Sequence, residues 1–162
     1  MKDLLDKLGS YNVFNYLLPG VVFVYSLQTV TAHNLINSNI VIGAFVYYFL
    51  GLIISRTGSL ILDPVLKKLG FIKFSSYQEF VAACKVDSKI EVFSEINNMY
   101  RTFCAMFLLI ATVRLYDIAS ISCPVLTVIA PYVLIIALLI LFLFSYKKQT
   151  EYIKKRIAIN NK

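Results

Sequence analysis

The stretch ATVRLYDIAS, residues 111–120, contains an arginine and an aspartate inside an otherwise apolar run. Arg114 and Asp117 are three residues apart, so on a helix their side chains are close enough to pair. Such a pair near the end of a membrane span would be neutralised and could reach the interface at a modest insertion cost. If the two residues instead faced a water-filled cavity in an oligomer, they would select ions. Pairing of Arg114 with a different helix is a third interpretation, and all three stay open.

Basic residues are concentrated in the C-terminal tail, where Glu151 is the only acid that offsets them. A dense cationic patch can bind anionic lipid headgroups or the phosphates of a nucleic acid or nucleotide. Lipid is the favoured ligand, because only Tyr146 and Tyr152 lie nearby for base stacking. The candidate binding residues are Lys147, Lys148, Lys154, Lys155 and Arg156, together with Lys67 and Lys68 on a neighbouring element.

Residue patterns typical of enzymes are missing from the sequence. It contains no Gly-rich phosphate loop, no Ser–His–Asp set and no HExxH motif. Cys84, Cys104 and Cys123 have no CxxC spacing, and the single histidine, His33, is far from all three in the sequence. We therefore expect no catalytic residue, no metal site and no cofactor.

The elements that must position these residues are predicted from the apolar runs. Hydrophobic residues make up 59% of the 162-residue chain, against about 45–50% in soluble domains. A helix needs about 20 apolar residues to cross the hydrocarbon of a bilayer. Four runs approach or exceed this length and predict an all-α protein with a single membrane domain over residues 1–162. The predicted transmembrane helices cover residues 13–32, 40–60, 101–120 and 124–146.

The topology follows from the positions of the basic residues. Fifteen of the 16 Lys and Arg residues lie in the N-terminal segment, in residues 56–101 or in the tail, and Arg114 is the exception. The positive-inside rule then places both termini in the cytoplasm. It also places there a helical insert over residues 61–99 and the basic tail over residues 147–162. We expect a multi-pass membrane protein with both termini in the cytoplasm.

Local signals add detail to this arrangement. Residues 1–10 predict an amphipathic helix on the inner membrane surface. In the insert, Asp63-Pro64 resembles a helix start and Gly70 a helix end. Two pairs match the capping-box pattern, Ser76 with Glu79 and Ser88 with Glu91, and no helix breaker separates the second pair from the third membrane run.

Small residues recur every four positions near the inner end of the second span. Gly51, Ser55 and Ser59 form a stripe that would let another helix backbone approach closely. Packing within one subunit is the favoured interpretation, and a seam between subunits is the alternative.

The layout resembles the small multi-helix membrane effectors of bacterial anti-phage operons. The resemblance is carried by the opening SYNVFNYLLPG, the four-helix layout, the short cytoplasmic insert and the basic tail. The Hailong-type membrane effector is the first candidate family, and the Kiwa membrane subunit is the second. The first resemblance implies a homo-oligomeric inner-membrane channel that depolarises infected cells, and it would make DNA oligomers the ligand of the basic patch.

Three functions are compatible with a small helical membrane protein. The first is a homo-oligomeric ion channel, such as a tetramer, gated by an anionic cytoplasmic ligand, because four helices are too few to enclose a wide pore alone. The second is a non-conducting anchor or sensor that recruits an operon-encoded cytoplasmic protein. The third is a small transporter, which we disfavour because no carboxylate lies near the middle of any span. We expect the channel, with Arg114 and Asp117 tuning the outer part of its pore.

Overall fold

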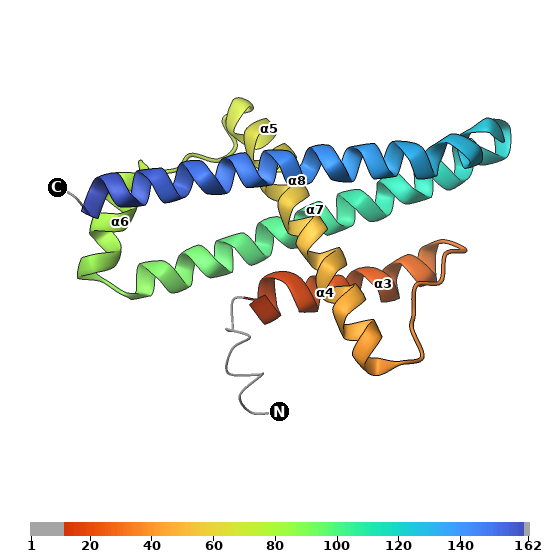
Figure 1. Cartoon of the computed structure of the whole chain (residues 1–162), viewed down its shortest axis with the longest axis horizontal. Coiled ribbons are helices and arrows are strands. Elements are labelled where there is room, and N and C mark those ends of the chain that lie inside the picture. The colour runs from red at the N-terminus through yellow and green to blue at the C-terminus, as the bar shows by residue number, and fades with distance from the viewer. Residues whose placement is uncertain (1–11, 161–162) are drawn as a thin grey trace.

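The computed structural model describes residues 12–160, and within this range the chain is helical with short connections and contains no strand (Figure 1). The all-helical prediction is therefore confirmed, whereas the amphipathic helix predicted over residues 1–10 lies outside the described residues. Two of the elements are π-helical turns, labelled η. The elements are η1 (Val13–Leu17), α3 (Leu18–Val30), α4 (Ile40–Thr57), η2 (Gly58–Leu62), α5 (Asp63–Lys68), α6 (Tyr77–Val86), α7 (Lys89–Ser122) and α8 (Val125–Asn160).

Four continuous helical stretches are long and apolar enough to cross a bilayer. They are Val13–Val30, Ile40–Lys68, Lys89–Ser122 and Val125–Ile159, so the prediction of four candidate spans is confirmed. The assignment of the two membrane sides remains a prediction from the basic residues.

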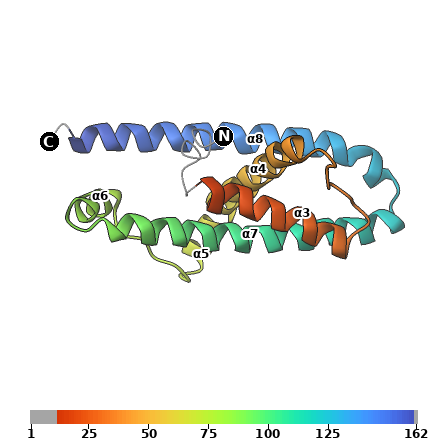
Figure 2. The ribbon, with the colours of Figure 1, turned by 90° about the horizontal axis from the view of Figure 1, so that it is seen from below.

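The third and fourth stretches are longer than a bilayer requires. Helix α7 has 34 residues and α8 has 36, so they are about 51 and 54 Å long, against a hydrocarbon thickness of about 30 Å. They run in opposite directions, and their polar ends lie together at the end of the molecule that also holds α6 (Figures 1 and 2). Helix α7 begins at Lys89 and continues without a break into the third apolar run, as the lack of helix breakers predicts.

The tightly packed part of the molecule lies between α3, α4 and α7. Its buried side chains are Phe23, Val24, Leu27, Ile54, Ala105 and Met106. Helix α4 crosses between α7 and α8 (Figure 2), and its backbone touches η1 closely, because a Cβ on Gly51 would overlap the Tyr16 carbonyl. Helix α8 adds no residue to this core, and its most apolar 18-residue window contains no buried residue.

The helix that contains the second predicted span does not end near residue 60. The helix continues from α4 through η2 into α5, and Asp63 lies in helical conformation inside it. A proline ring clashes with the carbonyl four residues earlier in a regular helix, which for Pro64 is the carbonyl of Leu60 in η2. Pro19 has the same relation to Asn15 in η1. The wider π-helical turns therefore give both prolines room without breaking the helix.

The connection between the second and third stretches matches the predicted signals only in part. Ser76 and Glu79 form the expected capping box, with N···O distances of 2.9 and 3.2 Å. Gly70 ends α5 with a φ of 73°, as expected for a closing glycine. The second capping box is wrong: Ser88 adopts helical φ and ψ and makes no cap bond. The neighbouring Asp87 carboxylate accepts a hydrogen bond from Lys89 N instead, at 2.9 Å.

Candidate functional site

A cluster of charged and polar residues joins three helices at one level of the bundle. Arg101 on α7 donates from Nη1 to Asp63 Oδ2 at 3.1 Å, and both side chains are largely buried. Lys148 on α8 donates from Nζ to the carbonyl and the hydroxyl of Ser59 in η2, at 2.8 and 2.6 Å. We call Ser59, Asp63, Arg101 and Lys148 the boundary cluster.

Helix lengths predict where the boundary cluster lies relative to a bilayer. From Arg101 to the end of α7 at Ser122 the helix rises about 32 Å, and from Lys148 back to Val125 it rises about 35 Å. From Ile40 to Ser59 the rise is about 29 Å. The lengths on α7 and α8 match the thickness of about 30 Å that a span must cross, whereas α4 crosses these two helices steeply, so its length does not measure the same direction (Figure 1). The lengths of α7 and α8 predict that the cluster lies at one membrane boundary, and the positive-inside rule predicts that this is the cytoplasmic one.

The boundary cluster has one more positive than negative charge. Asp63 is its single carboxylate, and it faces both the Arg101 guanidinium and, at longer range, the Lys148 ammonium. The charges of Lys67 and Arg56 also act on Lys148. Charges removed from water are stable only when they are paired and hydrogen-bonded. Asp63 therefore supplies the negative charge that stabilises both Arg101 and Lys148.

Sequence reasoning interpreted Asp63 as a helix cap and missed its pairing with Arg101. The signal was present in the small-residue stripe, because Asp63 continues the spacing Gly51, Ser55, Ser59 by one more step of four residues. Residues spaced in this way share a helix face. The face that carries the stripe therefore carries the carboxylate as well.

The stripe contacts three other elements of the same chain. Gly51 lies against the backbone of Tyr16 in η1. The Ser55 hydroxyl accepts a hydrogen bond from Thr102 Oγ1 on α7 at 3.3 Å, and Ser59 binds Lys148 on α8. Within the described chain, the stripe thus has the intrasubunit packing role that was favoured, and a seam between subunits is untested.

The structure separates Arg114 from Asp117. Asp117 Oδ1 lies 2.8 Å from His33 Nε2, which belongs to the connection between α3 and α4. Helical side chains slant towards the N-terminus, so Arg114 points away from the acid that follows it, which is the less favourable order for such a pair. In residues 12–160 Arg114 is exposed and makes no ion pair. Of the three interpretations of Arg114, its pairing with Asp117 is not among the ion pairs of residues 12–160.

The predicted cationic patch is also divided. Lys148 belongs to the boundary cluster, and Lys67 and Lys68 lie on α5, which follows that cluster directly. The exposed Lys154, Lys155 and Arg156 lie near the far end of α8. Lys147 is exposed beside Lys148. The tail and α5 therefore offer two separate basic surfaces rather than one.

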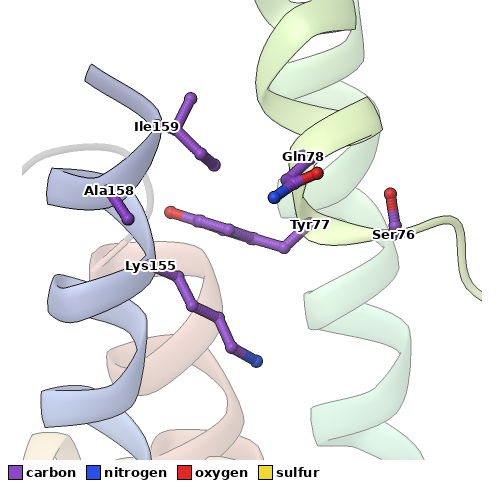
Figure 3. A pocket seen from close by; sticks show the side chains of 6 residues that line it. All are labelled: Ser76, Tyr77, Gln78, Lys155, Ala158 and Ile159. Carbon is purple, nitrogen blue, oxygen red and sulfur yellow. The ribbon is translucent and has the colours of Figure 1, made fainter. Parts of the chain in front are cut away.

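A recess of about 250 Å³ lies between the start of α6 and the end of α8. Tyr77 reaches from α6 across to α8, with its hydroxyl end beside Ala158, and Lys155 leaves α8 next to it (Figure 3). The Tyr77 ring also tilts against that of Tyr152, with centroids 5.6 Å apart. The lining is completed by Ser76, Gln78 and Ile159. Two aromatic rings beside a lysine could hold a flat or apolar group next to an anion.

Metal chemistry finds no support in the described part of the chain, where no group of three or more His, Cys, Asp or Glu residues could hold an ion. The three cysteines are free. No known protein family matches the sequence, and comparisons with curated proteins and with solved structures find no significant similarity.

Proposed function

We propose that this chain is the subunit of a homo-oligomeric membrane channel that is gated by an anionic ligand at its cytoplasmic face. The observation that carries the proposal is the state of Arg114, which is exposed on a membrane span and has no acidic partner within residues 12–160. The nearest acid along the helix, Asp117, is engaged by His33.

The depth of Arg114 supports a polar environment around it. It lies 13 residues beyond Arg101, which is about 20 Å along α7 and therefore about 10 Å short of the outer boundary of the hydrocarbon. An unpaired arginine at the centre of a span costs about 2.5–3.5 kcal/mol to insert, and Arg114, between the centre and the boundary, would bear part of this cost. A ring of subunits would remove this cost by lining a water-filled pore with the guanidinium groups.

The gating part of the proposal rests on the tail surface. Lys154, Lys155 and Arg156 supply positive charge, and Tyr77 and Tyr152 supply aromatic rings next to the recess. Phosphate groups with attached bases fit this combination. The resemblance to anti-phage membrane effectors adds the specific proposal that the ligand is a DNA oligomer and that the channel acts in defence at the bacterial inner membrane.

The subunit number is the first test. Native mass spectrometry of the protein in mild detergent should give four or more subunits, the range in which a central pore is geometrically possible. Ion flux in liposomes would then be compared with and without short DNA oligonucleotides. The tail variant K154Q/K155Q/R156Q should lose the oligonucleotide response, and K85Q on α6 is its control. A monomer, or a dimer in every lipid and detergent, would exclude the channel.

A non-conducting anchor is the second candidate, and one observation favours it. Val86 at the end of α6 is 90% exposed and Phe93 on α7 is 63% exposed, both on the cytoplasmic side of the boundary cluster. Apolar side chains exposed outside the membrane can bind a partner protein. Absence of flux from a stable oligomer, with the protein correctly inserted, would favour this anchor.

A further inference from the structure

The segment that follows the boundary cluster combines exposed lysines with exposed large apolar side chains. Residues 64–75 form a short hairpin, which we call the α5 hairpin. It contains three lysines and no acid, and Asp63, the residue directly before it, is paired with Arg101. Its exposed apolar residues are Val65, Leu69, Phe71 and Phe74.

The hairpin has a defined shape. The Gly70 turn is closed by hydrogen bonds from Gly70 N to the Lys67 carbonyl and from Phe71 N to the Leu66 carbonyl, both 3.0 Å long. The Lys67 ammonium lies 4.4 Å from the centre of the Phe74 ring, which belongs to the segment that follows the Gly70 turn. The two arms therefore hold each other while Leu69 and Phe71, 73% and 79% exposed, project from the tip.

The position of the hairpin gives these side chains a specific neighbour. Asp63 is bound to Arg101, whose level on α7 is the predicted membrane boundary, and Lys67 and Lys68 follow Asp63 on α5, which leaves the bundle sideways near this level (Figure 1). The headgroup layer extends about 5–8 Å beyond the hydrocarbon on each side. Both views place α5 at the margin of the molecule, beside the bundle and not under it (Figures 1 and 2).

We propose that the α5 hairpin docks into the headgroup layer of the inner leaflet, with Leu69 and Phe71 inserted towards the acyl chains and Lys67, Lys68 and Lys73 on anionic lipid phosphates. Apolar tips flanked by lysines are the arrangement that binds anionic membrane surfaces. A second copy of the hairpin would bring three lysines against three lysines, so charge complementarity favours lipid over self-association. The inference requires a chain embedded in a membrane, but neither a pore nor an oligomer.

The absence of tryptophan from the sequence allows a direct test. F71W introduces a single tryptophan at the hairpin tip, and F93W introduces one at an exposed phenylalanine on α7 beyond the boundary cluster. Each full-length protein would be reconstituted into phosphatidylcholine vesicles with or without phosphatidylglycerol. Quenching would then be measured with aqueous acrylamide and with brominated lipid. Circular dichroism in the same vesicles would verify that each variant is folded, and L69W provides a second tip reporter.

The proposal predicts a blue-shifted emission for F71W that is quenched by brominated lipid and protected from acrylamide when phosphatidylglycerol is present. F93W should remain open to acrylamide in both kinds of vesicle. Each lysine near an anionic surface favours the docked state by roughly fivefold. The triple change K67Q/K68Q/K73Q, combined with F71W, should therefore abolish the effect of phosphatidylglycerol.

Three results would overturn the docking. Acrylamide access at position 71 equal to that at position 93 would put the hairpin in water. Protection from both quenchers would show that protein covers the tip. Quenching by brominated lipid without any dependence on phosphatidylglycerol or on the lysines would remove the anionic-lipid site. None of these readouts depends on subunit number or ion flux, so the channel and the docked hairpin can fail separately.

Discussion

Helices α4 and α8 are both strongly apolar, yet only α4 packs closely against several other helices. Helix α4 and the following η2 contain Gly43, Gly51 and Gly58 with two serines, and they contact η1, α3 and α7. Helix α8 has no glycine, and no residue of its most apolar window is buried. In a bilayer, lipid solvates apolar side chains as well as another helix does, so close approach of backbones decides which helices pack together.

The same contrast holds for polar contacts. Helix α4 with η2 is joined to α7 through Ser55 and through Asp63 of the adjoining α5, whereas α8 is held at the boundary by Lys148 alone. Further along α8 the Phe142 ring stacks on Phe49 with centroids 6.0 Å apart. Helices α3, α4 and α7 thus form a closely packed unit, and α8 is attached to it at the boundary cluster.

The largest predicted effect comes from the backbone contact of α4. A methyl group at Gly51 would overlap the Tyr16 carbonyl, while one at Gly43 would meet the Tyr47 ring at an ordinary 3.4 Å. G51A should therefore lower the free energy of unfolding by about 3 kcal/mol, and G43A should change it little. Unfolding in mixed detergent micelles measures both. Equal effects of the two substitutions would contradict the close approach of α4 and η1.

The boundary cluster gives the next effect. D63A would leave Arg101 and Lys148 without their carboxylate, and because both members of the ion pair keep some solvent contact we expect a loss of about 2 kcal/mol. E91A, which removes an exposed acid from α7, is the control. The double variant D63A/R101A should recover part of the loss. A D63A protein as stable as E91A would show that the pair contributes nothing.

The attachment of α8 is tested by replacing Lys148, which donates hydrogen bonds to Ser59. K148M should weaken the attachment of α8 by about 1 kcal/mol. The change removes the hydrogen bonds from the ammonium to Ser59, but it also removes the cost of taking that charge out of water. In a background with the three cysteines changed to serine, the rate of disulfide formation between F49C and F142C reports the approach of the helices. K148M should slow it several-fold. K154M should leave it unchanged, and similar rates in both would mean that another contact holds α8.

The hydrogen bond between His33 and Asp117 should have the smallest effect. His33 is about half exposed, so removing its contact with Asp117 should cost below about 1 kcal/mol. A double-mutant cycle of H33A and D117N, followed by unfolding in micelles, isolates the pair. Additive single effects would show that the 2.8 Å contact carries no stability.

Much of the fold could be predicted because it follows from runs of one residue type. Apolar length predicted the four spans, and the unbroken run before Phe103 predicted the extension of α7. Local hydrogen-bonding patterns predicted the Ser76–Glu79 box and the turn at Gly70. The Asp63-Pro64 signal failed because a π-helical turn makes room for the proline, which a sequence pattern for regular helices does not include.

The site was harder to predict because its contacts join residues far apart in the chain. Asp63 and Arg101 are 38 residues apart, and Ser59 and Lys148 are 89 apart. His33 and Asp117 are separated by 84. Spacing along one helix offered Arg114 as a partner of Asp117. The loop between α3 and α4 instead brings His33 to Asp117, and this contact cannot be read from the spacing. Lys67 and Lys68 were grouped with the tail by charge alone, and their attachment to α5 separates them from it.

The central claim is that Arg114 lines a pore, and the reversal potential tests it most directly. Purified wild type, R114L and R114K would be reconstituted in planar bilayers under a potassium chloride gradient, with K85Q as a control outside the span. We expect R114L to shift the reversal potential towards that of potassium, because a cationic ring that favours chloride is removed, while R114K and K85Q keep the wild-type value. An unaltered reversal potential in a conducting, correctly inserted R114L protein would contradict the claim.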